Sequence, residues 1–185
     1  MGKIFFVTGG ARSGKSAFAE RLAVRSFRSV AYLATMEPRD EELQDRVARH
    51  RASRPADWET IEAPLAIGDA LGGVAADSCV ILDCLSLWVT NRLLEEHGDG
   101  ELSREAATAI EERLDQELEN VIAIAKRRDG MLIVVTNEVG SGVVPPYPLG
   151  RIYRDLLGRA NQRAARAADR AWLLVAGRAL ELTAD

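Results

Sequence analysis

A glycine-rich run near the N-terminus has the residue types and spacing of a phosphate-binding loop. Glycines let a backbone curl so that its N–H groups face phosphate oxygens, and the positive end of a following helix adds to the attraction. In such a loop the lysine reaches the outer phosphates of a nucleoside triphosphate, and the serine hydroxyl binds Mg²⁺. The pattern G-x-x-x-x-G-K-[ST] is satisfied by Gly9, Gly10, Ala11, Arg12, Ser13, Gly14, Lys15 and Ser16.

A second metal-binding acid is expected at the end of a neighbouring strand. The apolar run Val80-Ile81-Leu82 ends in Asp83, which makes Asp83 the candidate. An ordinary acid at a strand end is the alternative. The loop and this acid together predict phosphoryl or nucleotidyl transfer from a nucleoside triphosphate. A glycine-rich turn that binds nothing is the alternative for the loop, but its place between a predicted strand and a predicted helix argues against it.

Short apolar runs along the chain are predicted to be the strands that position this loop. Their continuous apolar character and β-branched content suit strands covered on both faces, as in a parallel sheet. Helical patterns lie between them, and the longest has apolar residues at three- and four-residue spacing, with Ser103 as its candidate N-cap. The expected strands are residues 4–7, 30–34, 79–82, 131–135 and 171–175, and the expected helices are residues 17–27, 40–53, 102–128 and 149–168.

The order of these elements predicts one α/β domain over residues 1–185. Strand and helix alternate, and no linker is long enough to divide the chain. Residues 175–180 have the pattern of a strand end, a tight turn and a short returning strand. The mostly parallel central sheet is therefore expected to end in a C-terminal antiparallel edge. The expected architecture is the three-layer sandwich of a RecA-like P-loop NTPase.

Composition limits the classes of partner. The net charge is −4 with acids and bases interspersed, so no sequence-independent binding to nucleic-acid phosphates is expected. The apolar runs are too short for a membrane span, and the cytoplasm is the expected location. Cys79 and Cys84 have no partner Cys or His at metal-ligand spacing, and both are interpreted as packing residues.

Short segments outside the phosphate loop carry distinctive combinations of residues. They are Tyr32-Leu33-Ala34-Thr35, Arg46-Val47-Ala48-Arg49-His50-Arg51 with Arg54-Pro55 and Trp58, Val89-Thr90-Asn91, Val135-Thr136-Asn137-Glu138-Val139-Gly140, Gly142-Val143-Val144-Pro145, Gly158-Arg159 and Asn161-Gln162. With the loop they span nearly all of the chain, which resembles the bifunctional adenosylcobinamide kinase/adenosylcobinamide-phosphate guanylyltransferase family, known as CobU or CobP. The loop is shared by many families, whereas the segments around His50 and from Thr136 to Pro145 are specific to this one.

The resemblance implies two reactions in assembly of the nucleotide loop of adenosylcobalamin. ATP or GTP first phosphorylates the hydroxyl of the aminopropanol arm of adenosylcobinamide. GTP then transfers GMP to that phosphate, and pyrophosphate leaves. The expected partners are thus adenosylcobinamide, its phosphate and GTP or ATP, with Mg²⁺ as cofactor, and the resemblance implies a homo-oligomer, a trimer.

The family's covalent GMP carrier is a histidine, and it matches His50. A neutral imidazole nitrogen is available near pH 7, and its phosphoramidate bond is reactive enough to pass GMP onward. Without the resemblance His50 would be interpreted as a solvated residue on a charged helix. The other histidine, His97, is interpreted as surface.

The resemblance also places residues near the nucleotide. Guanidinium groups such as those of Arg51 and Arg54 pair with phosphate oxygens, although a solvated helix end is the alternative. Asp83 stands where some relatives carry Glu, and either acid can hold Mg²⁺ directly or through water. The implied nucleotide contacts beyond the loop are Thr35, Met36, Glu37, Arg51, Ala52, Ser53, Arg54, Glu62 and Asp83, with Ser16 and Asp83 at the metal.

Polar residues after the fourth expected strand are also expected to face the site, because ligands of open parallel sheets lie beyond the carboxyl ends of strands. These residues are Thr136, Asn137 and Glu138. Arg151, Arg154 and Arg159 are second-rank candidates for contacts to phosphate or corrinoid, with exposed helix surface as the alternative.

Two other functions stay open on the residues alone. One is a P-loop kinase of another small metabolite, which would turn over without any covalent nucleotide. The other is a nucleotide switch or assembly ATPase, which would hydrolyse nucleotide slowly until a partner protein stimulated it.

Overall fold

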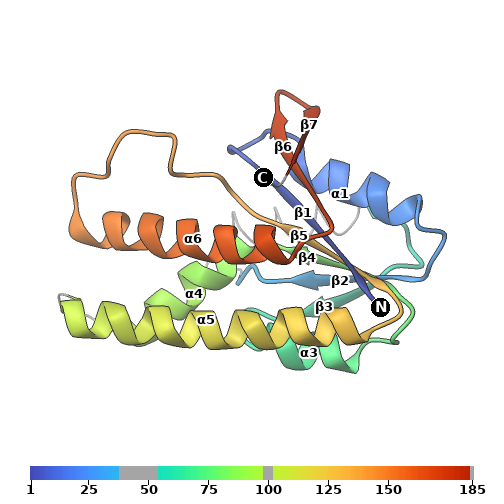
Figure 1. Cartoon of the computed structure of the whole chain (residues 1–185), viewed down its shortest axis with the longest axis horizontal. Helices are drawn as coiled ribbons and strands as arrows, with labels where there is room; N and C mark the ends of the chain where they lie inside the picture. Colours follow the sequence, from blue (N-terminus) through green and yellow to red (C-terminus); the bar gives the residue numbers. More distant parts are fainter. Residues whose placement is uncertain (38–53, 98–101, 184–185) are drawn as a thin grey trace.

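The computed structural model describes residues 1–37, 54–97 and 102–183, and the expected helix 40–53 lies outside them. Over these residues the chain forms a seven-stranded sheet with the order β3-β2-β4-β5-β1-β6-β7 (Figure 1). All neighbouring strands are parallel except β6 and β7, so the expected antiparallel C-terminal edge is confirmed. The strands are β1 (Lys3–Gly9), β2 (Val30–Ala34), β3 (Glu59–Glu62), β4 (Cys79–Asp83), β5 (Met131–Val135), β6 (Arg170–Val175) and β7 (Arg178–Leu182).

Helices cover both faces of the sheet and complete the expected three-layer sandwich. Successive side chains of a strand point to opposite faces, which creates two separate cores. In β5, Leu132 and Val134 belong to the larger core, while Ile133 and Val135 belong to the smaller one. The smaller core lies under α1 (Lys15–Val24), and the larger lies under α3 (Ile67–Gly73), α4 (Leu85–His97), α5 (Arg104–Arg127) and α6 (Pro148–Ala167) (Figure 1).

The longest of these helices, α5, has the cap and the face that its sequence predicts. The Oγ of Ser103 accepts a hydrogen bond from the N–H of Ala106 at 3.1 Å, which satisfies one of the free N–H groups of the first turn. Its buried side chains recur at three- or four-residue spacing. Arg163 of α6 donates through Nε to Asp115 of α5 at 3.0 Å, so the two helices are tied by a charged contact.

The patterns in the sequence do not predict β3, α3 or α4. β3 is a four-residue edge strand in which Thr60 and Ile61 lie between two glutamates, so it has no continuous apolar run. α4 begins at Leu85, only two residues after β4 ends, and no turn residues separate the two patterns. α3 has seven residues and ends in two glycines, which are poor helix formers. All three are held by packing that becomes visible only in the folded chain.

Cys79 and Cys84 are free and buried, as their interpretation as packing residues requires. Burial raises the pKa of each thiol to about 11, so both stay protonated and poorly nucleophilic near neutral pH. Among the helices of the described residues, none has the length and apolar character that a membrane crossing demands.

Candidate active site

The glycine-rich loop connects β1 to α1 at the carboxyl edge of the sheet, as predicted. α1 begins at Lys15, and Gly14 caps it with a φ of 94°, a conformation that glycine adopts without strain. A Cβ on Gly9 would lie 2.4 Å from the carbonyl oxygen of Leu174 on β6, so this position also requires glycine. The N-terminus of α1 therefore points its free N–H groups at the edge where the strands end, which is an anion-binding arrangement.

The turn between β6 and β7 supports this loop from the far side. The N–H of Gly177 donates to the carbonyl oxygen of Ser13 at 2.9 Å. A Cβ on Gly14 would lie 3.2 Å from the Cα of Gly177, so the two backbones pack closely. On the opposite flank, the N–H of Glu138 donates to the carbonyl of Gly9 at 3.0 Å. The antiparallel edge thus helps to fix the shape of the phosphate loop, a role that the motif alone does not reveal.

Lys15 is held inside the loop. Its Nζ donates to the carbonyl oxygen of Gly10 at 2.8 Å, and the residue is only 9% exposed. Burial lowers the pKa of Lys15, while the nearby Cys84 and Asp83 act in the opposite direction. An ammonium group in this position would be stabilised by the negative charge of a bound phosphate.

Asp83 ends β4 and belongs to the same charged site, but the expectation that it lies on the strand next to β1 is wrong. β5 lies between β1 and β4, because the strand order is β4-β5-β1. The charge of Asp83 still acts on Lys15, since α1 crosses the sheet and packs against both β4 and β5. The phosphate loop and the acid therefore belong to one charged site.

Tyr32 of β2 lies between this acid and Arg54. Its hydroxyl donates a hydrogen bond to Oδ2 of Asp83. The guanidinium carbon of Arg54 lies 3.3 Å from the centroid of the Tyr32 ring, a cation–π contact, and Nη1 of Arg54 donates to Oγ1 of Thr60 at 3.4 Å. The sequence reasoning placed Arg54 near the nucleotide but missed Tyr32. A single hydroxyl within the otherwise apolar strand 30–34 was the available signal.

Thr35 is placed at the expected edge, but its side chain faces the protein interior. It is fully buried, and its Oγ1 donates to the carbonyl of Cys84 at 2.8 Å and accepts from the N–H of Cys84 at 2.7 Å. Its own N–H donates to the carbonyl of Asp83 at 3.2 Å. Nδ2 of Asn91 donates to the carbonyl of Thr35 at 2.8 Å. Thr35 therefore joins the ends of β2 and β4 and fixes the backbone that carries Asp83.

The remaining described candidates lie at the same edge of the sheet. Met36 and Glu37 follow β2 and are half-buried. Glu62 ends β3, is exposed, and stands opposite Ala34 in the strand register. Their backbone positions bring them to the carboxyl ends of the strands beside the loop. His50, Arg51, Ala52 and Ser53 lie outside the described residues.

The three polar residues after β5, expected to face the site, use their side chains for contacts within the protein. Oγ1 of Thr136 donates to Oδ1 of Asn161 on α6 at 2.8 Å, so this side chain faces the helix layer. The expectation that it faces the phosphate loop is wrong. Nδ2 of Asn137 donates to Oγ of Ser86 at 3.2 Å. Oε1 of Glu138 accepts from the N–H of Gly140 at 2.6 Å and so shapes the turn after the strand. These contacts order the segment that flanks the phosphate loop.

The arginines of α6 make contacts within the protein. Nη1 of Arg151 donates to the carbonyl of Pro146 at 2.9 Å, which closes the loop before the helix. Nε of Arg154 lies 3.6 Å from Oδ1 of Asp155, which makes an ion pair. Arg159 forms an ion pair with Glu111 of α5. Arg159 therefore pairs with a neighbouring helix at the protein surface, which agrees with the alternative interpretation of this residue as exposed helix surface.

Known proteins resemble this chain over nearly its full length. The family model "CobU: Cobinamide kinase / cobinamide phosphate guanyltransferase" matches residues 5–182. The bifunctional adenosylcobalamin biosynthesis protein CobP of Pseudomonas aeruginosa is 41% identical over 180 residues, covering 97% of this chain and 96% of the relative. Its counterpart CobU of Salmonella typhimurium is 39% identical over 175 residues, covering 94% and 96%.

A solved structure shares the fold. The crystal structure of the RadB recombinase superimposes with a TM-score of 0.51 at 17% identity, covering 92% of this chain and 73% of that one. At this identity the likeness shows the architecture alone, and that architecture is the expected RecA-like one. The match to the family, the phosphate loop at the end of β1 and the acid at the end of β4 agree, and the chain belongs to the CobU family of cobinamide kinase/cobinamide phosphate guanyltransferases.

Proposed function

We propose that this one site carries out both reactions of the family on adenosylcobinamide: phosphorylation by ATP or GTP, and then transfer of GMP from GTP to the new phosphate. The observation that carries the proposal is the placement of Lys15 and Asp83 within one charged site at the carboxyl edge. A nucleotide held there serves as phosphoryl donor in the first step and as GMP donor in the second. A kinase of another metabolite or a nucleotide switch has no comparable support, given the family match over residues 5–182.

In the kinase step the loop N–H groups and Lys15 bind the outer phosphates of the triphosphate. The oxygen of the acceptor hydroxyl attacks the γ-phosphorus and its proton passes to solvent, while the bond from the γ-phosphorus to the β-phosphate oxygen breaks and the nucleoside diphosphate leaves. Lys15 offsets the charge that develops on the transferring group and on the leaving oxygen. The step consists mostly of positioning and charge stabilisation.

The donor set fits Mg²⁺. Ser16 lies in the first turn of α1 and Asp83 ends β4, so a hydroxyl and a carboxylate provide two hard oxygen donors beside the loop. Mg²⁺ is usually bound by one or two carboxylates, waters and substrate phosphates, and it needs no dedicated cage of protein ligands. Bound there, it would neutralise charge on the phosphates. Tyr32 and Thr35 would hold Asp83 in place.

In the guanylyl step we propose His50 as the nucleophile. Its imidazole nitrogen attacks the α-phosphorus of GTP, the bond to the bridging oxygen breaks, and pyrophosphate leaves. The phosphate of adenosylcobinamide phosphate then attacks the same phosphorus, the P–N bond breaks, and adenosylcobinamide-GDP forms with free His50. The support is the chemistry of a neutral imidazole and the position of His50 four residues before Arg54 in the chain.

Incubation with GTP labelled at the α-phosphate tests this proposal. We expect an acid-labile, base-stable protein adduct in the wild type and in His97→Ala, and none in His50→Ala. His97 is the matched control, because the chain has two histidines. An adduct that persists in His50→Ala would move the nucleophile elsewhere, and turnover of adenosylcobinamide phosphate without any adduct would overturn the two-step route.

We further propose a homotrimer, as the resemblance implies, and a cytoplasmic location. Light scattering on the purified chain tests the trimer, and a monomeric mass across active concentrations would contradict it.

A further inference from the structure

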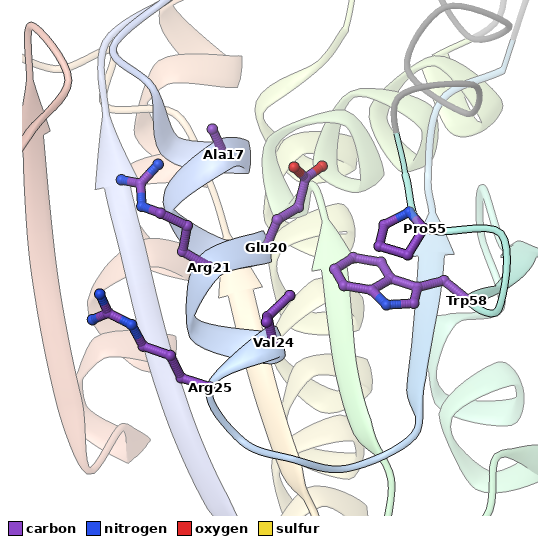
Figure 2. Close-up of a pocket in the computed structure, with 7 residues that line it drawn as sticks. All are labelled: Ala17, Glu20, Arg21, Val24, Arg25, Pro55 and Trp58. Atoms are coloured by element: carbon purple, nitrogen blue, oxygen red, sulfur yellow. The ribbon is translucent and has the colours of Figure 1, made fainter.

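A groove lies beside α1, and none of its lining residues belongs to the phosphate loop. It has a volume of about 450 Å³. Ala17, Glu20 and Val24 of α1 line one side, and Pro55 and Trp58 line the other (Figure 2). Figure 2 shows Trp58 and Pro55 across from Glu20 and Val24, and within the part of the chain that the structure describes no helix lies between them. The groove is therefore an open trough between α1 and the segment that precedes β3.

The Trp58 side of the groove is fixed by contacts to the active site. The N–H of Trp58 donates to the carbonyl of Pro55 at 3.1 Å, which closes a turn. Trp58 is half-buried and packs against the core beneath α1. Just before this turn, Arg54 stacks on Tyr32, whose hydroxyl is bonded to Asp83. The groove wall and the acid at the metal position thus share one chain of contacts.

The chemistry of the groove suits a large ligand with an apolar face and polar edges. Val24 is 58% exposed although apolar, and Trp58 and Pro55 add rigid apolar surface opposite it. Arg21 and Arg25 lie on the far flank of α1, where their side chains point away from Trp58 (Figure 2). Aromatic and aliphatic walls with a few charged groups at the rim are typical of sites for ring-shaped ligands.

The position of the groove connects it to the phosphate loop. It starts at Ala17, the residue after Ser16, and continues to Arg25, a distance of roughly 12 Å along the helix axis. A ligand in the groove can place one end beside the transferring phosphate. A second hollow, lined by Leu65, Arg92 and other residues, lies among α3, α4 and α5 in the opposite layer, where it cannot present a ligand to the loop.

We propose that this groove binds the corrin ring of the acceptor, with the ring against Trp58 and Val24 and the aminopropanol arm directed toward the phosphate loop. The proposal rests on the proposed function, which requires an acceptor far larger than its reacting hydroxyl. A corrin is a broad macrocycle with apolar faces and amide-bearing edges, which matches the apolar walls and the Glu20 carboxylate between them. The groove holds part of the ring, and the rest stays in solvent.

Kinetics of three variants test the assignment. Val24→Glu places a charge on the α1 side of the groove, at an exposed position of the helix, and Trp58→Ala removes the aromatic side chain of the opposite wall. Leu180→Glu is the matched control, because Leu180 is 61% exposed and lies on β7 away from the groove. We expect KM for adenosylcobinamide to rise at least about tenfold in the first two variants and not in the control. KM for the nucleotide and kcat at saturating acceptor should stay within about twofold of wild type.

Unchanged KM for the acceptor in both groove variants would overturn the assignment. A rise confined to KM for the nucleotide would also overturn it, since the groove would then belong to the nucleotide. Trp58→Phe keeps an aromatic side chain at this wall and so separates loss of the wall from a folding defect in Trp58→Ala. We expect its affinity for the acceptor to be close to that of wild type.

Equilibrium dialysis of cobinamide against the protein without nucleotide separates this inference from the proposed function. Binding that is lost in Val24→Glu supports the groove even if the wild type proved unable to phosphorylate the acceptor, a result that would reject the proposed function alone. Equal binding by the wild type and Val24→Glu would reject the groove while leaving the two reactions intact.

Discussion

The phenol of Tyr32 donates a hydrogen bond to the carboxylate of Asp83, which joins β2 to the acid at the end of β4. Tyr32 is 2% exposed, and burial, followed by the charge of Asp83, raises the pKa of its hydroxyl. The hydroxyl therefore stays protonated and remains a donor over the working pH range. A neutral donor beside a carboxylate fixes the direction of its oxygens without removing its charge.

Tyr32→Phe removes this donor and keeps the ring beneath Arg54. We expect the Mg²⁺ concentration that gives half-maximal kinase activity to rise about three- to tenfold, because a hydrogen bond to a charged group contributes on the order of 1 kcal/mol or more. Mg²⁺ titration of phosphoryl transfer at saturating nucleotide measures the effect. Tyr147→Phe is the control, since Tyr147 is 62% exposed. If kinase activity depends on Mg²⁺ concentration identically in Tyr32→Phe and wild type, the Tyr32 hydroxyl does not position the Asp83 carboxylate.

Gly9→Ala and Gly10→Ala separate the two neighbouring glycines of the loop. A Cβ at position 9 would lie 2.4 Å from the backbone oxygen of Leu174, whereas a Cβ at position 10 meets nothing within 4 Å. We expect Gly9→Ala to lower the free energy of unfolding by about 2–4 kcal/mol and Gly10→Ala to change it by less than about 0.5 kcal/mol. Urea denaturation measures both. Equal stability of the two variants would mean that the loop relaxes freely around position 9.

The sequence predicts those parts of the fold in which burial leaves a continuous apolar run. The bounds expected for β2 and β5 match the structure, because both strands are covered on two faces. β3 was missed because it is a partly exposed edge strand with charged ends. The order of strands cannot be read from such runs, so β5 was not expected between β1 and β4.

The same limit applies to the site. The phosphate loop is local in sequence, so its glycines, Lys15 and Ser16 were identified from spacing. The supports of the loop and of Asp83 are contacts between residues far apart in the chain, as with Gly177 and Ser13 or Tyr32 and Asp83. Whether Thr35 faces the ligand or the interior depends on the register between β2 and β4, which no pattern within β2 encodes.

Thr35→Val and Thr35→Ser test whether the Thr35 hydroxyl holds the end of β4. Valine keeps the shape but leaves the buried N–H of Cys84 without its side-chain acceptor, which costs about 1–3 kcal/mol, while serine keeps the oxygen. We expect Thr35→Val to unfold at lower urea concentration and Thr35→Ser to stay within about 1 kcal/mol of wild type. Nucleotide affinity, measured by calorimetry, should follow the same order. A Thr35→Val variant of full stability with weakened nucleotide binding would instead indicate direct contact between the hydroxyl and the ligand.

Lys15→Met is expected to abolish kinase activity and to raise the thermal stability of the protein. Burial lowers the pKa of Lys15 from its ordinary value of 10.5, so the protonated side chain is disfavoured in the folded protein relative to the unfolded chain. Methionine has a similar length and no charge. We therefore expect kinase activity to be lost while Tm near pH 7 rises by about 2–4 °C. The control is Lys126→Met on the exposed face of α5. Because Lys126 is exposed, its replacement should leave both activity and Tm unchanged.

The pH dependence of the increase in Tm tests whether the buried charge of Lys15 is its cause. The penalty on wild type is fully present below the folded pKa of Lys15, shrinks as pH rises through that value, and disappears toward 10.5, where the unfolded chain also loses its proton. The difference in Tm between Lys15→Met and wild type should therefore narrow as pH increases, measured by thermal unfolding without nucleotide. A difference that is constant with pH would assign the gain to packing of the methionine. A Lys15→Met variant that still phosphorylates adenosylcobinamide would remove Lys15 from the phosphate site.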